Sequence, residues 1–316
     1  MSHDPSAGTT ASGAPARSEG APREAEGNGF SGRLPFGARL AAAMDDHGPL
    51  CVGIDPHSAL LASWGLTDDV AGLREFSLRV VEAVGGRVAA VKPQSAFFER
   101  HGSAGIAVLE ETLAALRDVG SLSILDVKRG DIGSTMDGYA QAYLLDAAPL
   151  AADAITVSPY LGYGSLAPAL EAASATGRGL FVLGLTSNPE GATVQHATAS
   201  SGRAVAAMIA DGAAASNAAA RAQGVLGSIG LVVGATIGDA ARDLGIDLAA
   251  TNAPLLAPGV GAQGAGEAEL ARVFGPARSQ VLASTSRGVL GAGPDPEALR
   301  EAAGRAVLEA GRALRR

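Results

Sequence analysis

Short apolar runs alternate with helix-like stretches along most of the chain, and this alternation limits the fold more than any other feature. Eight runs have the length of buried strands, at residues 50–55, 88–92, 122–128, 154–157, 180–186, 229–234, 255–258 and 281–284. Helical apolar spacing is found at 68–84, 104–118, 134–148, 164–175, 201–223, 238–248, 265–274 and from 296 to about 314. Strands that are apolar throughout, each followed by a helix, predict a parallel sheet covered by helices on its outer face.

Eight strand–helix units over about 280 residues are typical of a closed (β/α)8 barrel, the TIM barrel of the α/β class. The alternative is an open, doubly wound sheet, which usually has fewer strands and gathers its ligand at one switch point. Polar residues or glycines follow nearly every run, which favours the barrel, because a barrel brings all its strand ends to one rim. These residues are Asp55, Lys92, Asp126 with Lys128, Ser158, Ser187, Gly234, Gly259 and Arg287.

Composition divides the chain into two parts. Residues 1–34 are rich in Ser, Gly, Ala, Pro, Glu and Arg, which is typical of a disordered tail, and residues 35–316 form the predicted single barrel domain. The tail has no apolar core resembling a signal peptide, and no stretch of the chain reaches the roughly 18 apolar residues that a membrane span needs.

Charge and cysteine content limit the partners and the compartment. The chain has 24 basic and 32 acidic residues and a formal net charge of -8, which argues against nucleic acid or an anionic membrane as the main partner. Cys51 is the only cysteine, so no internal disulfide can form, and a reducing cytoplasm is the expected location. We expect Cys51 to be a small buried residue of its strand.

Two loops after the last strands have the composition of a phosphate site. The seventh run continues into Pro258-Gly259-Val260-Gly261-Ala262-Gln263-Gly264, and the eighth into Ser284-Thr285-Ser286-Arg287-Gly288. Closely spaced glycines let backbone N–H groups approach an anion, and Arg287 adds a planar charged fork. Because the loops after strands 7 and 8 are the usual phosphate site of barrel enzymes, they predict a phosphorylated ligand.

The third run ends in the charged sequence Asp126-Val127-Lys128, and Asp131 follows three residues later. Asp126 and Lys128 share one face of a strand, whereas Asp131 lies beyond Gly130 in a loop. Such charges are costly to desolvate unless they pair, so a purely structural ion pair is one explanation. The other is catalysis: beside Asp126, Lys128 stays protonated and acts as a proton donor, not as a Schiff-base nucleophile. Loss of a substrate carboxylate as CO2, followed by protonation of the carbanion, fits this pattern.

Other catalytic motifs are missing from the sequence. The five histidines have no metal-ligand spacing, and there is no nucleophile elbow, P-loop or dinucleotide fingerprint. We therefore expect chemistry by Asp and Lys without a metal or other cofactor. The long polar connection at 186–201 follows the fifth strand at the same rim and is predicted to be a lid.

Together these residues resemble the orotidine 5'-phosphate decarboxylase family. Its motif D-x-K-x-x-D-I-x-x-T is matched by Asp126, Lys128, Asp131, Ile132 and Thr135. The longer, type 2 branch of the family is similar in the runs Val91-Lys92-Pro93-Gln94, Phe97-Phe98-Glu99, Ser158-Pro159-Tyr160-Leu161-Gly162 and Thr186-Ser187-Asn188-Pro189. The resemblance extends from about Pro35 to the C-terminus.

The resemblance implies cofactor-free decarboxylation of orotidine 5'-phosphate to UMP and CO2 in de novo pyrimidine biosynthesis. It implies that Lys128 protonates C6 of the pyrimidine, that Asp126 presses against the substrate carboxylate, and that Lys92 completes the charged chain and bonds the ribose. Asp131 and Thr135 would cross into the neighbouring subunit's site, which implies a homodimer with shared active sites.

The resemblance also implies the binding residues. Asp55 would bind on the ribose or pyrimidine side, and Ser187 would bind the pyrimidine amide. Gln263 would belong to the lid on the phosphate side, and Arg287 with Gly288 would bind the phosphate.

Two alternatives share parts of this pattern. A related barrel, such as a 3-keto-sugar-phosphate decarboxylase or a hexulose-phosphate synthase, shares the D-x-K-x-x-D element but uses Mg2+. A non-catalytic phosphate-binding barrel would keep the glycine-rich loops, yet it would not need costly opposed charges.

Overall fold

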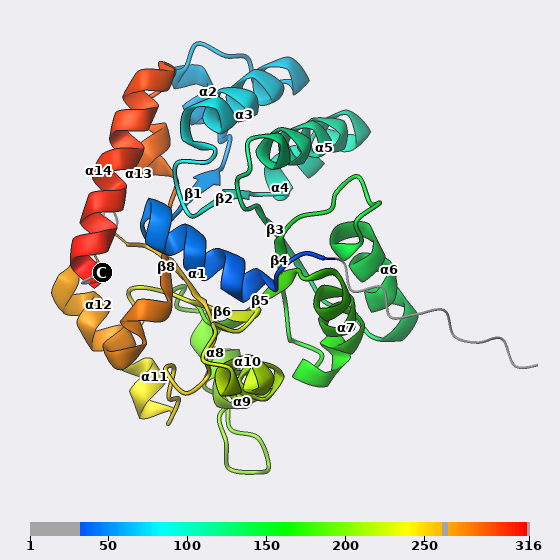
Figure 1. Cartoon of the computed structure of the whole chain (residues 1–316), viewed down its shortest axis with the longest axis vertical. Helices are drawn as coiled ribbons and strands as arrows, with labels where there is room; N and C mark the ends of the chain where they lie inside the picture. Colours follow the sequence, from blue (N-terminus) through cyan, green and yellow to red (C-terminus); the bar gives the residue numbers. More distant parts are fainter. Residues whose placement is uncertain (1–31, 261–264, 315–316) are drawn as a thin grey trace, which may run out of the picture.

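Eight parallel strands form one sheet in a computed structural model that describes residues 32–260 and 265–314. Neighbouring strands follow the order β2-β1-β8-β7-β6-β5-β4-β3, and most of the helices lie around the outside (Figure 1). The strands are β1 (Leu50–Ile54), β2 (Ala90–Pro93), β3 (Ile124–Arg129), β4 (Ala154–Val157), β5 (Gly179–Leu185), β6 (Ile229–Val233), β7 (Leu255–Pro258) and β8 (Val281–Thr285). All eight predicted strands are present, each within a few residues of its predicted bounds.

The two ends of the sheet, β2 and β3, meet at a seam. This seam has isolated bridges, Val91 with Ser123 and Gln94 with Asp126, where the other strands share continuous ladders. The sheet is thus a nearly closed barrel, and the predicted TIM-barrel fold is confirmed.

The helices follow the strands, with additional short helices in the loops. They are α1 (Phe36–His47), α2 (Ser58–Ser63), α3 (Val70–Val84), α4 (Ala96–Glu99), α5 (Gly102–Asp118), α6 (Gly133–Leu144), η1 (Tyr163–Leu166), α7 (Ala167–Thr176), α8 (Gly191–Gln195), α9 (Val205–Ser216), α10 (Ala218–Ala222), α11 (Ala240–Asp243), α12 (Glu267–Phe274), η2 (Gly275–Gln280), α13 (Arg287–Leu290) and α14 (Pro296–Leu314). No helix among the described residues is both long and apolar enough to cross a bilayer.

Two predicted helices differ from the observed ones. The helix expected at 201–223 is divided into α9 and α10 at Asn217, which is 2% exposed. The Asn217 amide donates to the backbone oxygens of Ile229 and Thr251 and accepts from the Ile229 N–H, so tertiary hydrogen bonds to β6 and to the connection before β7 end the helix there. The segment expected to be helical at 238–248 is helical only at Ala240–Asp243.

Helix α1 covers the amino-terminal end of the barrel, and Figure 1 shows it lying across the middle of the ring. Its buried side chains Phe36, Leu40 and Met44 pack on the lower inward-facing residues of the strands, among them Phe181, whose ring meets that of Phe36 edge to face at 5.9 Å. Cys51 belongs to the same cluster, as expected, and burial raises the pKa of its thiol to about 12. Apolar packing therefore fills this end, and polar chemistry is left to the other.

Removing the Phe36 ring should destabilise the barrel strongly. We expect Phe36→Ala to lower the free energy of unfolding by about 3–5 kcal/mol, since a fully buried aromatic ring leaves a cavity. Urea unfolding would measure it. Leu34→Ala, at a residue 67% exposed, is the matched control and should change stability by less than about 0.5 kcal/mol. Equal effects of the two substitutions would contradict the role of α1 as a packed closure.

Most of the predicted tail, residues 1–31, lies outside the described residues. Of the remainder, Arg33 contacts the barrel: its guanidinium donates to Asp146 Oδ1 at 2.8 Å and to the backbone oxygen of Thr176 at 2.9 Å. The division into a disordered tail and a barrel domain stays a prediction.

Candidate active site

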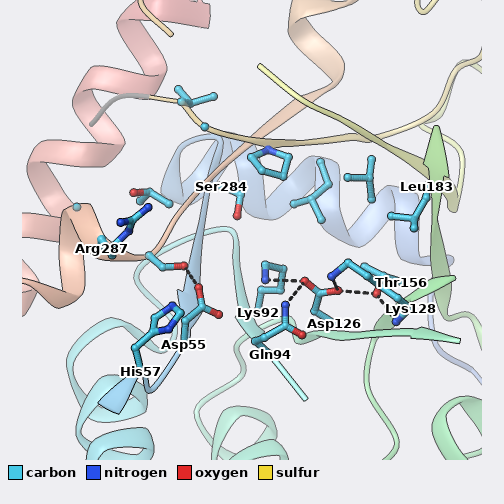
Figure 2. Close-up of a pocket in the computed structure, with 18 residues that line it drawn as sticks. Asp55, His57, Lys92, Gln94, Asp126, Lys128, Thr156, Leu183, Ser284 and Arg287 are labelled. Atoms are coloured by element: carbon cyan, nitrogen blue, oxygen red, sulfur yellow. Dashed lines mark hydrogen bonds and ion pairs between the residues drawn. The ribbon is translucent and has the colours of Figure 1, made fainter. Parts of the chain in front are cut away.

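A cavity of about 550 Å3 opens at the carboxyl ends of the strands (Figure 2). Residues from, or directly after, every strand line it, as a barrel rim requires. They are Asp55, His57, Lys92, Gln94, Asp126, Lys128, Thr156, Leu183, Val232, Leu256, Pro258, Gly259, Val260, Ser284, Thr285, Ser286, Arg287 and Gly288.

Strand alternation explains how these side chains reach the cavity. Side chains two residues apart on a strand share a face, so a residue two positions after a lower core residue faces the cavity. Lys92 follows Ala90 of the lower cluster in this way, and Asp126 follows Ile124. The apolar lower layer is thus the floor below a charged upper layer.

Asp126 is the centre of the charged layer and accepts four hydrogen bonds (Figure 2). Its Oδ2 accepts from Lys92 Nζ at 2.9 Å and from Gln94 Nε2 at 3.0 Å. Its Oδ1 accepts from Lys128 Nζ at 2.6 Å and from Thr156 Oγ1 at 2.8 Å. The carboxylate is therefore saturated with donors and held in one orientation.

The charges fix the protonation states of this layer. Burial alone would raise the pKa of Asp126, but the charges of Lys92 and Lys128 and their hydrogen bonds hold that pKa below its usual range. Burial would also lower the pKa of Lys92, but Asp126 and then Asp55 keep that pKa above its usual value. Asp126 is thus ionised at neutral pH. Its contribution to stability is present above the usual Asp pKa and is lost as the pH falls through the depressed pKa.

The two lysines differ in access to the cavity. The Lys92 side chain is 9% exposed, whereas that of Lys128 is 48% exposed. Lys128 also has a positive φ of 45°, a conformation that residues other than glycine adopt at a cost. Of the two lysines, Lys128 is therefore the more accessible to a bound molecule, and its backbone is held in a strained state.

Asp55 has one carboxylate oxygen bonded to Ser286 and one without a hydrogen-bond partner among the described residues. Its Oδ2 accepts a hydrogen bond from Ser286 Oγ, and a side chain on Gly53 would collide with both groups. Its Oδ1 is buried at the cavity and has no hydrogen-bond partner among the described residues. An unpaired buried carboxylate oxygen is costly, so a hydroxyl donor from a ligand would stabilise it.

The predicted phosphate loops form the mouth of the cavity. Pro258, Gly259, Arg287 and Gly288 all line it, and Gly259 has a φ of 94°, which favours glycine. Arg287 is exposed and forms no salt bridge with a described residue. Among the described residues, no acidic side chain therefore competes with an anion for its guanidinium.

Other predicted site residues lie outside this cavity. Asp131, Thr135 and Ser187 do not line it, and Asp131 Oδ1 accepts a hydrogen bond from the adjacent Ile132 N–H. Thr135 is exposed on α6, and Ser187 is exposed beside Gly234. Gln263 lies outside the described residues.

The sequence prediction missed several lining residues. Thr156, Leu183, Val232 and Leu256 are inward-facing residues of β4 to β7, and Leu183, Val232 and Leu256 give that side an apolar surface. Alternation within the predicted strands could have indicated them, because each lies two positions before or after another inward-facing residue. The bond from Gln94 to Asp126 had no signal in the sequence.

The connection after β5 is internally bonded. The Thr186 N–H donates to Gln195 Oε1 at 2.9 Å, and Gln195 is the last residue of the short helix α8. Asn188 Nδ2 donates to Glu190 Oε2 at 3.0 Å, directly before that helix. The lid function predicted for this segment stays a prediction. Across the described residues, no group of three or more His, Cys, Asp or Glu side chains is placed to hold a metal ion.

Comparison with known proteins gives a consistent result. The model of the orotidine 5'-phosphate decarboxylase / HUMPS family matches residues 48–302. The orotidine 5'-phosphate decarboxylase of Streptomyces coelicolor is 60% identical over 276 residues, which are 87% of this chain and 96% of that protein. The one from Salinispora arenicola is 61% identical over 279 residues, 88% of this chain and 98% of that protein.

Two solved structures are similar to this chain in fold and in length. A crystal structure of a Streptomyces avermitilis protein assigned as an orotidine 5'-phosphate decarboxylase has a TM-score of 0.86 and 59% identity, and covers 91% of this chain and 99% of its own. The structure of Leishmania donovani OMP decarboxylase has a TM-score of 0.69 and 31% identity, and covers 90% of this chain and 100% of its own.

Proposed function

The chain belongs to the orotidine 5'-phosphate decarboxylase / HUMPS family, and we propose that its cavity converts orotidine 5'-phosphate to UMP and CO2. The reaction is that of a carboxy-lyase in pyrimidine biosynthesis. One observation carries the proposal for the site: Asp126, saturated by four donors, holds the accessible Lys128 ammonium at 2.6 Å inside the cavity. A bound substrate carboxylate beside Asp126 is raised in energy by that fixed negative charge, and the energy is released when neutral CO2 forms.

The proton transfer balances without a cofactor. The bond between C6 and the carboxylate carbon breaks, and its electron pair stays on C6 as CO2 leaves. Lys128 Nζ gives a proton to C6 and becomes neutral, and its 48% exposure lets it regain a proton from solvent after product release. Lys92, fixed against Asp126, keeps the carboxylate in place while Lys128 changes charge.

The remaining cavity residues support a nucleotide. The unpaired Asp55 Oδ1 suits a ribose hydroxyl, and the guanidinium of Arg287 with the Gly259 and Gly288 loops suits a phosphate. The apolar surface made by Leu183, Val232 and Leu256 suits one edge of a pyrimidine ring. Ser187 and Gln263 stay predictions as pyrimidine and phosphate-side contacts.

We further propose a homodimer with shared sites. Asp131 lies outside its own cavity, beside Ile132, which is 62% exposed. Tyr160 and Leu161 on the neighbouring loop after β4 are 78% and 53% exposed, so large apolar side chains cluster on the loops that follow adjacent strands. Exposed apolar groups of this kind are typical of protein interfaces.

A groove gives the partner's loop a place to bind. This groove, of about 500 Å3, adjoins the catalytic cavity, and its lining includes Phe97, Glu99, Arg129, Asp126 and Lys128. The partner's segment around Asp131 and Thr135 would enter there and add a carboxylate beside Lys128. The cytoplasmic location inferred from the single cysteine stays a prediction.

A chelator experiment separates the proposed reaction from the Mg2+-dependent relatives. We expect the absorbance of orotidine 5'-phosphate to fall at an unchanged rate when EDTA is present, because the proposed steps use only Asp and Lys groups. Loss of activity with EDTA, restored by Mg2+, would favour a metal-dependent relative. If orotidine 5'-phosphate is not consumed under either condition, the proposed reaction is wrong.

A further inference from the structure

Strand β3 departs from regular pairing with β4 at the reaction centre. The pairing of Leu125 with Ile155 is regular. The next pair along the ladder joins Arg129 to Val157, so three residues of β3 lie opposite Thr156 alone. Such a bulge leaves backbone groups without ladder partners and redirects side chains. The bulged residues are Asp126 to Lys128, so the irregularity sets the position of the charged pair.

The Thr156 hydroxyl replaces the missing ladder contacts. Thr156 is 1% exposed, and its Oγ1 accepts a hydrogen bond from the Lys128 backbone N–H at 2.9 Å. The same hydroxyl donates to Asp126 Oδ1 at 2.8 Å, the bond drawn in Figure 2. A hydroxyl has one proton to donate and lone pairs to accept, so it joins the two bulged residues directly.

We propose that Thr156 is a positioning residue for the decarboxylation, which rests on the function proposed above. Its hydroxyl holds the Lys128 backbone in the left-handed conformation and fixes Asp126 relative to it. The proton donor and the carboxylate then keep the geometry in which Nζ lies 2.6 Å from Oδ1. Thr156 needs no contact with substrate for this role, because it acts through the two groups that it bonds.

The physical reason for a large effect is geometric. Without the hydroxyl, the Lys128 N–H loses its acceptor, and the φ of 45° loses a contact that maintains it. A small displacement of a reacting group costs on the order of 10²-fold in rate. Phosphate binding at Arg287 and the glycine loops does not depend on Thr156, so substrate affinity should change little.

Four variants test this role. Thr156→Val keeps the shape and removes the hydroxyl, whereas Thr156→Ser keeps the hydroxyl. Thr112→Val is the matched control, because Thr112 is also fully buried and its hydroxyl donates to the Val108 backbone oxygen far from the site. Should Thr156→Val fail to fold, Thr156→Ala replaces it, since alanine and serine differ by the one hydroxyl.

We expect the loss of the hydroxyl to lower kcat and to leave substrate binding nearly unchanged. Thr156→Val should lower kcat about 10- to 100-fold, with KM and the dissociation constant of UMP within about threefold of wild type. Thr156→Ser should restore most of kcat, and Thr112→Val should leave it unchanged.

Three outcomes would overturn the inference. They are a Thr156→Val enzyme with wild-type kcat, a loss of UMP affinity equal to the loss of kcat, and a Thr156→Ser enzyme as slow as Thr156→Val. Absence of turnover in the wild type would instead overturn the proposed function, so the two failures are distinguishable.

Discussion

Replacing Lys128 with alanine is expected to lower kcat by more than about 10⁴-fold while UMP binding changes little. Proton donation alone is typically worth about 10²–10⁴-fold, and the variant also loses the cation that faces the cavity and pairs with Asp126 Oδ1. Single-turnover consumption of orotidine 5'-phosphate measures the loss. Titration with UMP measures what remains of binding at Arg287 and the glycine loops.

A second variant distinguishes proton donation by Lys128 from the effect of its positive charge. Lys128→Arg keeps a positive charge near Asp126, but a guanidinium does not release its proton at neutral pH. We expect Lys128→Arg to be nearly as slow as Lys128→Ala if proton donation dominates. A kcat close to wild type in either variant would show that C6 receives its proton from another group.

Mixing two inactive variants is expected to restore activity if the sites are shared. Lys128→Ala and Asp131→Ala should each be nearly inactive as pure proteins. In an equal mixture with free subunit exchange, half of the dimers are hybrids, and each hybrid has one site with both residues intact. Activity should therefore return to roughly a quarter of wild type.

A matched mixture controls for nonspecific effects. Lys128→Ala mixed with Lys128→Arg has no intact site in any hybrid, because both substitutions remove the lysine from the cavity of their own barrel. That mixture should stay inactive. Recovery in this control would show that mixing has a nonspecific effect. No recovery with Asp131→Ala, once exchange is verified, would argue that Asp131 acts within its own chain.

The sequence predicted the barrel because its signals are local and repeated. Apolar runs such as the one around Leu180 are buried in any parallel sheet, so each strand could be located separately. Asp126 and Lys128 were placed on one face for the same reason, and the structure has both in the cavity. The helix break at Asn217 was not predictable, because its partners on Ile229 and Thr251 are distant in sequence.

The site was only partly predictable for a related reason. The positive φ of Lys128 and the bulge beside it depend on how β3 meets β4, which no residue pattern within β3 reveals. In the sequence, Thr156 is indistinguishable from any other β-branched strand residue. Only the structure shows its hydrogen bonds with the Lys128 N–H and with Asp126 Oδ1. The apolar lining from Leu183 and Val232 likewise looks like ordinary core.

Asp126 also has a structural role at the seam between β2 and β3. Few ladder bonds join these strands, yet the Asp126 carboxylate accepts from Lys92 and Gln94 across this seam. Enzymes often lose stability where they gain catalytic groups, so inactive variants are often more stable than the parent. Asp126 is an exception to this trend. Its loss would leave the buried Lys92 charge unpaired and remove hydrogen bonds across the seam, which would lower the stability of the fold, whereas loss of Lys128 would do neither. In an evolving barrel that no longer needs the activity, we therefore expect Lys128 to be lost before Asp126.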